Sequence, residues 1–210
     1  PIFLPAPDAM NYSLLISDYN GFQISCNGET DGEIIINPPS GGTPPYQYSI
    51  DGGALGTNST FSNLTAGQYT ISVNDLIGCT SDTLINIQEP GSFSLNTNIN
   101  NSITCPEVCN GAVSVSQLNG VAPINYTLSG GSATQTNTFW SNLCGELSYG
   151  NYTIDAIDQN GCTSNITFSI PEPQPFVYTV DSLPETCFSS NGQAIINQIS
   201  GGTGVWSYSW

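Results

Sequence analysis

The sequence predicts an all-β protein made of tandem β-sandwich repeats of about 80 residues. Apolar residues alternate with polar ones along short segments, and Gly, Pro, Asn and Asp clusters interrupt these segments roughly every 8–12 residues. The whole pattern also recurs, since Ile24-Ser25-Cys26 returns as Ile103-Thr104-Cys105. A recurring unit of this length is typical of a repeat array.

Four segments of the first repeat are predicted to be strands with one buried face, because side chains two positions apart lie on the same side of a strand. The second half of the repeat recurs most clearly, since residues 67–71 align with residues 150–154. The apolar positions of the four strands are Ile34 and Ile36; Tyr46, Tyr48 and Ile50; Tyr69, Ile71 and Val73; and Leu84, Ile85 and Ile87.

Self-alignment predicts the domain organisation. Residues 1–10 are expected to be a lead-in or linker, 11–90 the first repeat and 91–173 the second. Residues 174–210 align with the first half of a repeat, so the given sequence is expected to stop within a third domain.

A leucine, a glycine and then a tyrosine lead into one strand of each complete repeat. In the first repeat the tyrosine is Tyr69, and in the second it is Tyr152. This arrangement is typical of the tyrosine corner of Ig-like domains, in which the phenol oxygen bonds to the backbone just upstream. Its recurrence in register predicts that the sandwiches are Ig-like.

The seven cysteines are expected to form disulfides in an oxidising compartment, because metal-ligand companions are scarce. If each repeat is one sandwich, its cysteines pair within it, and the extra two in the second repeat pair with each other. Free buried thiols are the alternative. The predicted pairs are Cys26–Cys79, Cys105–Cys162 and Cys109–Cys144, with the partner of Cys187 lying past Trp210.

The chain carries sixteen Asp and Glu residues and no Lys, Arg or His. Binding to nucleic acid or to anionic lipid needs cationic side chains, so neither is expected. Histidine-dependent nucleophiles, lysine Schiff bases, histidine-zinc sites and P-loops are excluded for the same reason. No apolar stretch approaches the roughly 18 residues of a membrane span, so membrane insertion is not expected.

Carboxylates are the only catalytic groups left to consider. Asp82-Thr83-Leu84 and Asp181-Ser182-Leu183 do not fit the Asp-Thr/Ser-Gly turn of aspartic proteases. A sandwich of about 80 residues also has little room for the two-carboxylate cleft of a glycosidase. The sequence therefore predicts neither catalysis nor a cofactor.

Asp75 and Asp158 precede glycines at an expected hairpin in each repeat, and two roles are open to them. Carboxylates are hard ligands that suit calcium. Alternatively, aspartate and glycine together build the turn, with the aspartate bonding nearby backbone. The second role is favoured, because no established calcium-loop spacing is present.

The unit resembles the SprB repeat in the residues that punctuate it. They run from Cys26-Asn27-Gly28 through Gly41-Gly42-Thr43-Pro44-Pro45-Tyr46 and Ala66-Gly67-x-Tyr69 to Asp75-x-x-Gly78-Cys79 and Glu89-Pro90. The resemblance implies a secreted segment of a giant cell-surface adhesin of gliding Bacteroidetes, exported by the type IX secretion system. It also implies adhesion to extracellular surfaces or polysaccharides, contact with the gliding machinery, and an extended stalk of neighbouring repeats in one chain.

Two further expectations accompany this resemblance. Thr83 and Ser182 stand in Asp-Ser/Thr-hydrophobic sequences similar to the O-glycosylation sites of this bacterial group. As an alternative to the adhesin, the repeats are spacers or glycan-binding modules of a large secreted enzyme whose catalytic domain lies outside this segment.

Overall fold

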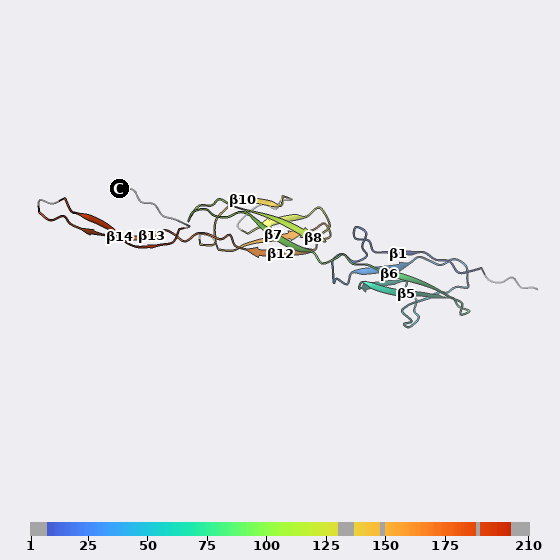
Figure 1. The fold of residues 1–210 in the computed structure, drawn as a ribbon. Coiled ribbons are helices and arrows are strands. Elements are labelled where there is room, and N and C mark those ends of the chain that lie inside the picture. The colour runs from blue at the N-terminus through green and yellow to red at the C-terminus, as the bar shows by residue number, and fades with distance from the viewer. Residues whose placement is uncertain (1–7, 130–136, 148–149, 188–189, 203–210) are drawn as a thin grey trace, which may run out of the picture. The chain divides into compact units, whose positions relative to one another are not determined.

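The computed structural model describes residues 8–129, 137–147, 150–187 and 190–202 (Figure 1). In these ranges every regular element is a strand, so the all-β prediction is confirmed. None of the described residues forms a helix long and apolar enough to cross a membrane. Contacts divide the chain into two compact units: Pro1–Ser94 with Gln117–Ile124 and Ile157–Ser164, and the rest of the chain.

Two three-stranded antiparallel sheets form the sandwich of unit 1. Ile34, Ile36, Ile71, Val73 and Ile87 are buried between the sheets together with Ile24. The alternating pattern predicts an inward face for all of these residues except Ile24. One sheet has the order β1 (Leu14–Ile16), β2 (Gly32–Ile36), β4 (Thr60–Leu64), and the other β3 (Gln47–Ile50), β5 (Gly67–Asn74), β6 (Thr80–Ile87).

The strand β6 differs from its prediction at one residue. Ile85 and Ile87 face the core, but Leu84 is 60% exposed. Period-two alternation allows only one of Leu84 and Ile85 to point inward. The register of β6 against β5 pairs Tyr69 with Ile85 and Ile71 with Thr83, and it therefore turns Leu84 outward.

The lead-in residues take part in the first sandwich. The Gly42 N–H donates to the carbonyl of the lead-in residue Asp8 at 3.0 Å, and Asn11, just after the lead-in, forms a β-bridge with Ser40. Gly41 has a φ of 74°. A Cβ at Gly41 would meet the Ala9 carbonyl oxygen, so its backbone passes directly against the lead-in.

Unit 2 holds most of a second pair of antiparallel sheets and a hairpin. Its buried apolar residues include Val113, Tyr126, Ile154 and Ile170. The large apolar side chains of the hairpin are mostly exposed. The sheets have the orders β7 (Ser94–Asn101), β8 (Gly111–Leu118), β10 (Phe139–Leu143) and β9 (Asn125–Leu128), β11 (Tyr152–Ile157), β12 (Thr163–Phe168), and the hairpin pairs β13 (Val177–Leu183) with β14 (Gln193–Ser200).

Candidate functional site

The loop that carries Cys26 lies at the end of the sandwich where β6 finishes. The Ile24 N–H donates to the Gln88 carbonyl at 3.2 Å, two residues before the cysteine. Just after it, the Gly28 N–H donates to the Glu89 carboxylate at 2.6 Å. The amide of Asn27 donates to the Pro90 carbonyl at 3.2 Å. Cys26 is therefore held at the point where the chain leaves the first sandwich.

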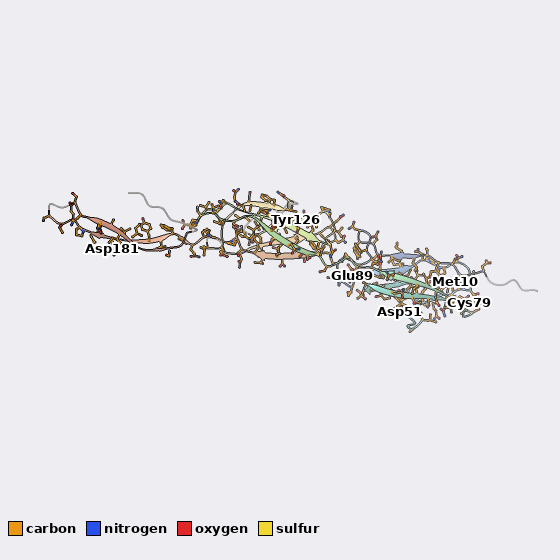
Figure 2. All side chains as sticks on the ribbon, in the orientation of Figure 1. Met10, Asp51, Cys79, Glu89, Tyr126 and Asp181 are labelled. Carbon is orange, nitrogen blue, oxygen red and sulfur yellow. A yellow bond between two sulfur atoms is a disulfide. The ribbon has the colours of Figure 1, made fainter. Side chains whose placement is uncertain are left out.

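Cys79 lies in the turn between β5 and β6, which is organised by the carboxylate of Asp75. One oxygen of Asp75 accepts the N–H groups of Ile77 at 3.1 Å and Cys79 at 2.8 Å. The other oxygen accepts the Thr43 N–H at 2.9 Å. The same turn lines a cavity with Met10, so Cys79 stands at the end of the sandwich where the chain enters (Figure 2).

The predicted pair Cys26–Cys79 is wrong, because the two cysteines lie at opposite ends of β6. Figure 2 shows Cys79 at one end of the first sandwich and Glu89, which binds the Cys26 loop, at the other. Eight residues of β6 separate these ends. A strand of that length covers roughly 26 Å, whereas bonded cysteines need Cα atoms within about 7 Å.

Cys26 is bonded instead to Cys162, with a Cα–Cα distance of 5.6 Å. Cys162 lies in the turn between β11 and β12, within residues 157–164, which belong to unit 1. Because Cys162 is used in this bond, the predicted pair Cys105–Cys162 is also wrong. The second disulfide of the structure joins Cys109 to Cys144.

The turn that carries Cys162 is built like the turn that carries Cys79. One carboxylate oxygen of Asp158 accepts the N–H groups of Asn160 and Cys162, both at 2.9 Å. The other accepts the Val121 N–H at 2.9 Å. The side-chain amide of Asn160 also donates to the carbonyls of Tyr19 and Ser25, at 3.3 and 3.2 Å. The disulfide is therefore accompanied by polar contacts.

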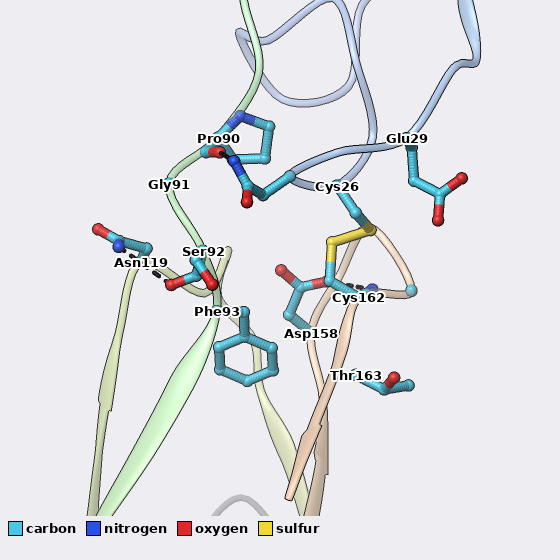
Figure 3. Close-up of a pocket in the computed structure, with 12 residues that line it drawn as sticks. Cys26, Glu29, Pro90, Gly91, Ser92, Phe93, Asn119, Asp158, Cys162 and Thr163 are labelled. Carbon is cyan, nitrogen blue, oxygen red and sulfur yellow. Dashed lines mark hydrogen bonds between the residues drawn. A yellow bond between two sulfur atoms is a disulfide. The ribbon is translucent and has the colours of Figure 1, made fainter. Parts of the chain in front are cut away.

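A polar pocket of about 250 Å³ surrounds this disulfide (Figure 3). Its wall includes Asn119, whose amide donates to the Ser92 carbonyl at 3.1 Å. The carboxylate of Asp158 is already occupied by three backbone N–H groups. The lining also carries the hydroxyls of Ser92 and Thr163 and the carboxylate of Glu29.

The two tyrosines of the predicted corners bond to backbone upstream of themselves. The Tyr69 hydroxyl donates to the Thr65 carbonyl at 3.0 Å. The Tyr152 hydroxyl contacts both backbone groups of Cys144, accepting from its N–H at 2.8 Å and lying 3.3 Å from its carbonyl. In the second repeat the corner therefore holds a residue that is also disulfide-bonded.

The two residues proposed for O-glycosylation, Thr83 and Ser182, differ in their exposure. The Thr83 hydroxyl lies 2.8 Å from the Tyr12 hydroxyl and is only partly exposed. Ser182 is exposed on β13. A glycan on Thr83 would replace a hydrogen-bonded contact, whereas Ser182 is accessible. The Trp140 ring packs edge-on against buried Tyr126, with 6.3 Å between the ring centroids, and Trp206 and Trp210 lie outside the described residues.

Asp75 and Asp158 are occupied as hydrogen-bond acceptors that close their turns. Burial of Asp75 by itself raises its pKa, because it disfavours the charged form. The backbone N–H groups of Cys79, Thr43, Ile77 and Gly78 outweigh burial and bring the pKa below its ordinary value of 3.8. Within the described residues, no three Asp, Glu, Cys or His side chains converge as metal ligands.

The lowered pKa of Asp75 predicts an acid-sensitive contribution to the stability of the first repeat. A carboxylate whose pKa is lower in the folded state stabilises the fold above its unfolded pKa, and this stabilisation is lost as pH falls through the folded value. The Tm of the wild type should therefore exceed that of Asp75→Asn at about pH 6. The difference should close below pH 3.8. A pH-independent difference would contradict the assignment.

Comparison with known proteins gives one family. Residues 23–55 match the SprB repeat. The match covers the Cys26 loop, β2 and β3 of the first sandwich. The resemblance to the SprB repeat predicted from the sequence is therefore confirmed for this part of the chain. A search of curated proteins with the chain gives no match.

Two solved structures are similar to the chain at low identity. One is the C-terminal 282-residue fragment of intimin in complex with the intimin-binding domain of the translocated intimin receptor, with 12% identity and a TM-score of 0.40. The other is a tetra-tandem repeat in the extending region of a large adhesion protein, with 15% identity and a TM-score of 0.28. The alignments cover 83% and 92% of this chain, and 67% and 64% of those chains.

Proposed function

We propose that this chain is a non-catalytic segment of a large secreted cell-surface adhesin, in which tandem SprB-type repeats form a stalk. The observation that carries the proposal is the SprB match at residues 23–55, within a unit whose loops recur later in the chain. Many weak contacts presented by repeated domains gain avidity without any single strong site. The cell surface is the proposed location, and extracellular surfaces or polysaccharides are the proposed partners.

The finer proposal is that the adhesin serves gliding motility, with export by the type IX system and attachment to the gliding machinery. It is supported by the SprB match. Beads that carry antibodies against the folded chain should bind living cells that display it and be carried along their surface. Beads that bind and remain stationary would contradict gliding while leaving the adhesin proposal intact.

Adhesion by this segment itself can be tested with the isolated chain. Glycan arrays and polysaccharide-coated surfaces should retain the oxidised chain at high surface density and lose it at low density, because single contacts are weak. If the chain is not retained at any density, these repeats act as spacers alone.

We also propose O-glycosylation at Ser182, because this residue is exposed. The intact mass of the native protein should then exceed the mass of its sequence by that of the glycan.

The absence of Lys and Arg predicts complete resistance to trypsin, a useful property for an exposed stalk. The chain should stay intact on a denaturing gel even after it has been unfolded and reduced before digestion. Chymotrypsin, which cleaves after aromatic residues, is the positive control. Ser182→Arg should give two tryptic fragments, because it supplies the chain's one tryptic site. Tryptic fragments from the wild-type chain would contradict the prediction.

A further inference from the structure

The cysteines recur in two structural settings, one at each end of a repeat. Cys26 lies at the exit end of the first sandwich, and Cys79 lies in the turn at the entrance end. The disulfide Cys26–Cys162 joins an exit loop of the first sequence repeat to a turn of the second. Both of its cysteines, and the residues that contact the turn, belong to unit 1.

Cys105 occupies the same setting as Cys26. The Glu107 N–H donates to the Glu172 carboxylate at 2.6 Å, as Gly28 donates to Glu89 in the first repeat. Upstream, Ile103 is buried like Ile24. Cys105 is nevertheless an exposed thiol, whereas Cys26 is bonded.

Cys79 occupies the same setting as Cys162. Both cysteine N–H groups donate to a buried aspartate four residues upstream, at 2.8 and 2.9 Å. Each aspartate also accepts the N–H of a residue in an earlier loop: Asp75 accepts that of Thr43, before β3, and Asp158 that of Val121, before β9. Cys79 is an exposed thiol too, although its equivalent is bonded.

We propose that the exit-loop cysteine of each repeat forms a disulfide with the turn cysteine of the repeat that follows it. Cys26–Cys162 is one such link. Cys105 is then expected to bond to the turn cysteine of a following repeat, and Cys79 to the exit-loop cysteine of a preceding one. Cys187, which aligns with Cys26 and Cys105, is the next exit-loop position. Each repeat is thereby disulfide-bonded to the next one along the array. This proposal does not depend on whether the repeats adhere to a surface.

Each link forms by thiol–disulfide exchange with a low-molecular-weight disulfide. Glutathione disulfide is the oxidant used in the experiment. The two cysteine thiols release two protons and two electrons as their S–S bond forms. The oxidant's S–S bond takes up both electrons and both protons and becomes two thiols. The two cysteines belong to one chain, so their high effective concentration favours this link over bonds between chains.

The first measurement is peptide mapping of the oxidised 210-residue chain, alkylated without reduction. A protease that cleaves after Asp and Glu separates Cys105 from Cys109, because Glu107 lies between them. The expected products are a Cys26–Cys162 linked peptide and alkylated peptides of Cys79 and Cys105. Linked Cys26–Cys79 or Cys105–Cys162 peptides would overturn the proposal.

The second measurement supplies Cys105 with its missing partner. A second copy of residues 91–173 is inserted after Pro173, so that a turn cysteine now follows Cys105. Ser102→Thr in the original repeat and Thr163→Ser in the inserted copy give their otherwise identical peptides different masses. Cys105 should become linked to the inserted turn cysteine, and its alkylation should fall by about tenfold or more.

The matched control carries Cys162→Ser in the inserted copy only, and it should restore alkylation of Cys105. Both repeats release the same Cys109–Cys144 peptide, so complete absence of its alkylated form shows that the inserted copy has also folded and formed this bond. Alkylated Cys105 beside a folded copy, a glutathione adduct on Cys105, or a dimer of chains linked through Cys105 would each overturn the proposal.

The converse extension keeps the proposal testable if that insertion fails to fold. A second copy of residues 11–90, placed before Asn11, puts an exit-loop cysteine ahead of the original Cys79. Thr80→Ser in the original repeat gives its Cys79 peptide a mass different from that of the added copy. Linkage of the added copy's Cys26 to the original Cys79 is expected, with the added copy's Cys79 alkylated. Persistent alkylation of that Cys79 would overturn the proposal.

Discussion

Ile71→Ala is expected to destabilise the first sandwich by about 2–5 kcal/mol, the usual cost of truncating a buried isoleucine. Ile71 has no exposed surface and lies on β5, which β3 and β6 flank on either side. For a domain of this size the loss lowers Tm by roughly 10–30 °C. Thermal and urea unfolding, followed by circular dichroism, measure it.

Leu84→Ala is the matched control for Ile71→Ala. Leu84 lies on the neighbouring strand β6 but is 60% exposed, so its truncation should change stability by less than about 0.5 kcal/mol. Ile154→Ala, at the equivalent buried position of the second repeat, should resemble Ile71→Ala. Equal losses for Leu84→Ala and Ile71→Ala would contradict the register of β6.

Gly41→Ala is expected to destabilise the first sandwich by about 2–5 kcal/mol, the sum of two costs. A side chain at a φ of 74° is strained. In addition, the new Cβ would collide with the Ala9 carbonyl, so the lead-in must move. The loss should appear as a lower Tm, together with earlier proteolysis near residues 8–10.

Gly52→Ala separates the two costs. Gly52 has a similar φ of 70°, but a Cβ there has nothing within 4 Å. Its substitution should therefore cost only the backbone strain, about 1–2 kcal/mol. If Gly41→Ala and Gly52→Ala are equally destabilised, the contact between the lead-in and the Gly41 loop contributes nothing to stability.

The strands and the core of the first repeat could be predicted from the sequence, because alternation reports directly which side chains share a face. Ile34, Ile71 and Val73 are buried as the pattern indicates. The pair Leu84-Ile85 could not be resolved in this way. Both residues are apolar and adjacent, so only the pairing of β6 with β5 decides which one faces inward.

The pairs Cys26–Cys79 and Cys105–Cys162 were predicted wrongly because recurrence in register reports equivalence and not proximity. Cys26 and Cys79 recur together as Cys105 and Cys162 whether the bonds lie within a repeat or between repeats. The length of β6 is the signal that could have decided. Cys79 directly precedes that strand, and the Glu89-Pro90 junction just after it binds the Cys26 loop.

The Cys26–Cys162 bond also determines how the chain transmits tension. When the two termini are pulled, force crosses this bond and bypasses the intervening segment, a sequence separation of 136 residues. β2 to β11 lie inside this segment, whereas β1 and β12 to β14 lie outside it. Cys109–Cys144 is nested within the same segment and bears no load while the outer bond is intact. The oxidised chain should therefore reach a contour length about 450–490 Å shorter than that of the reduced chain.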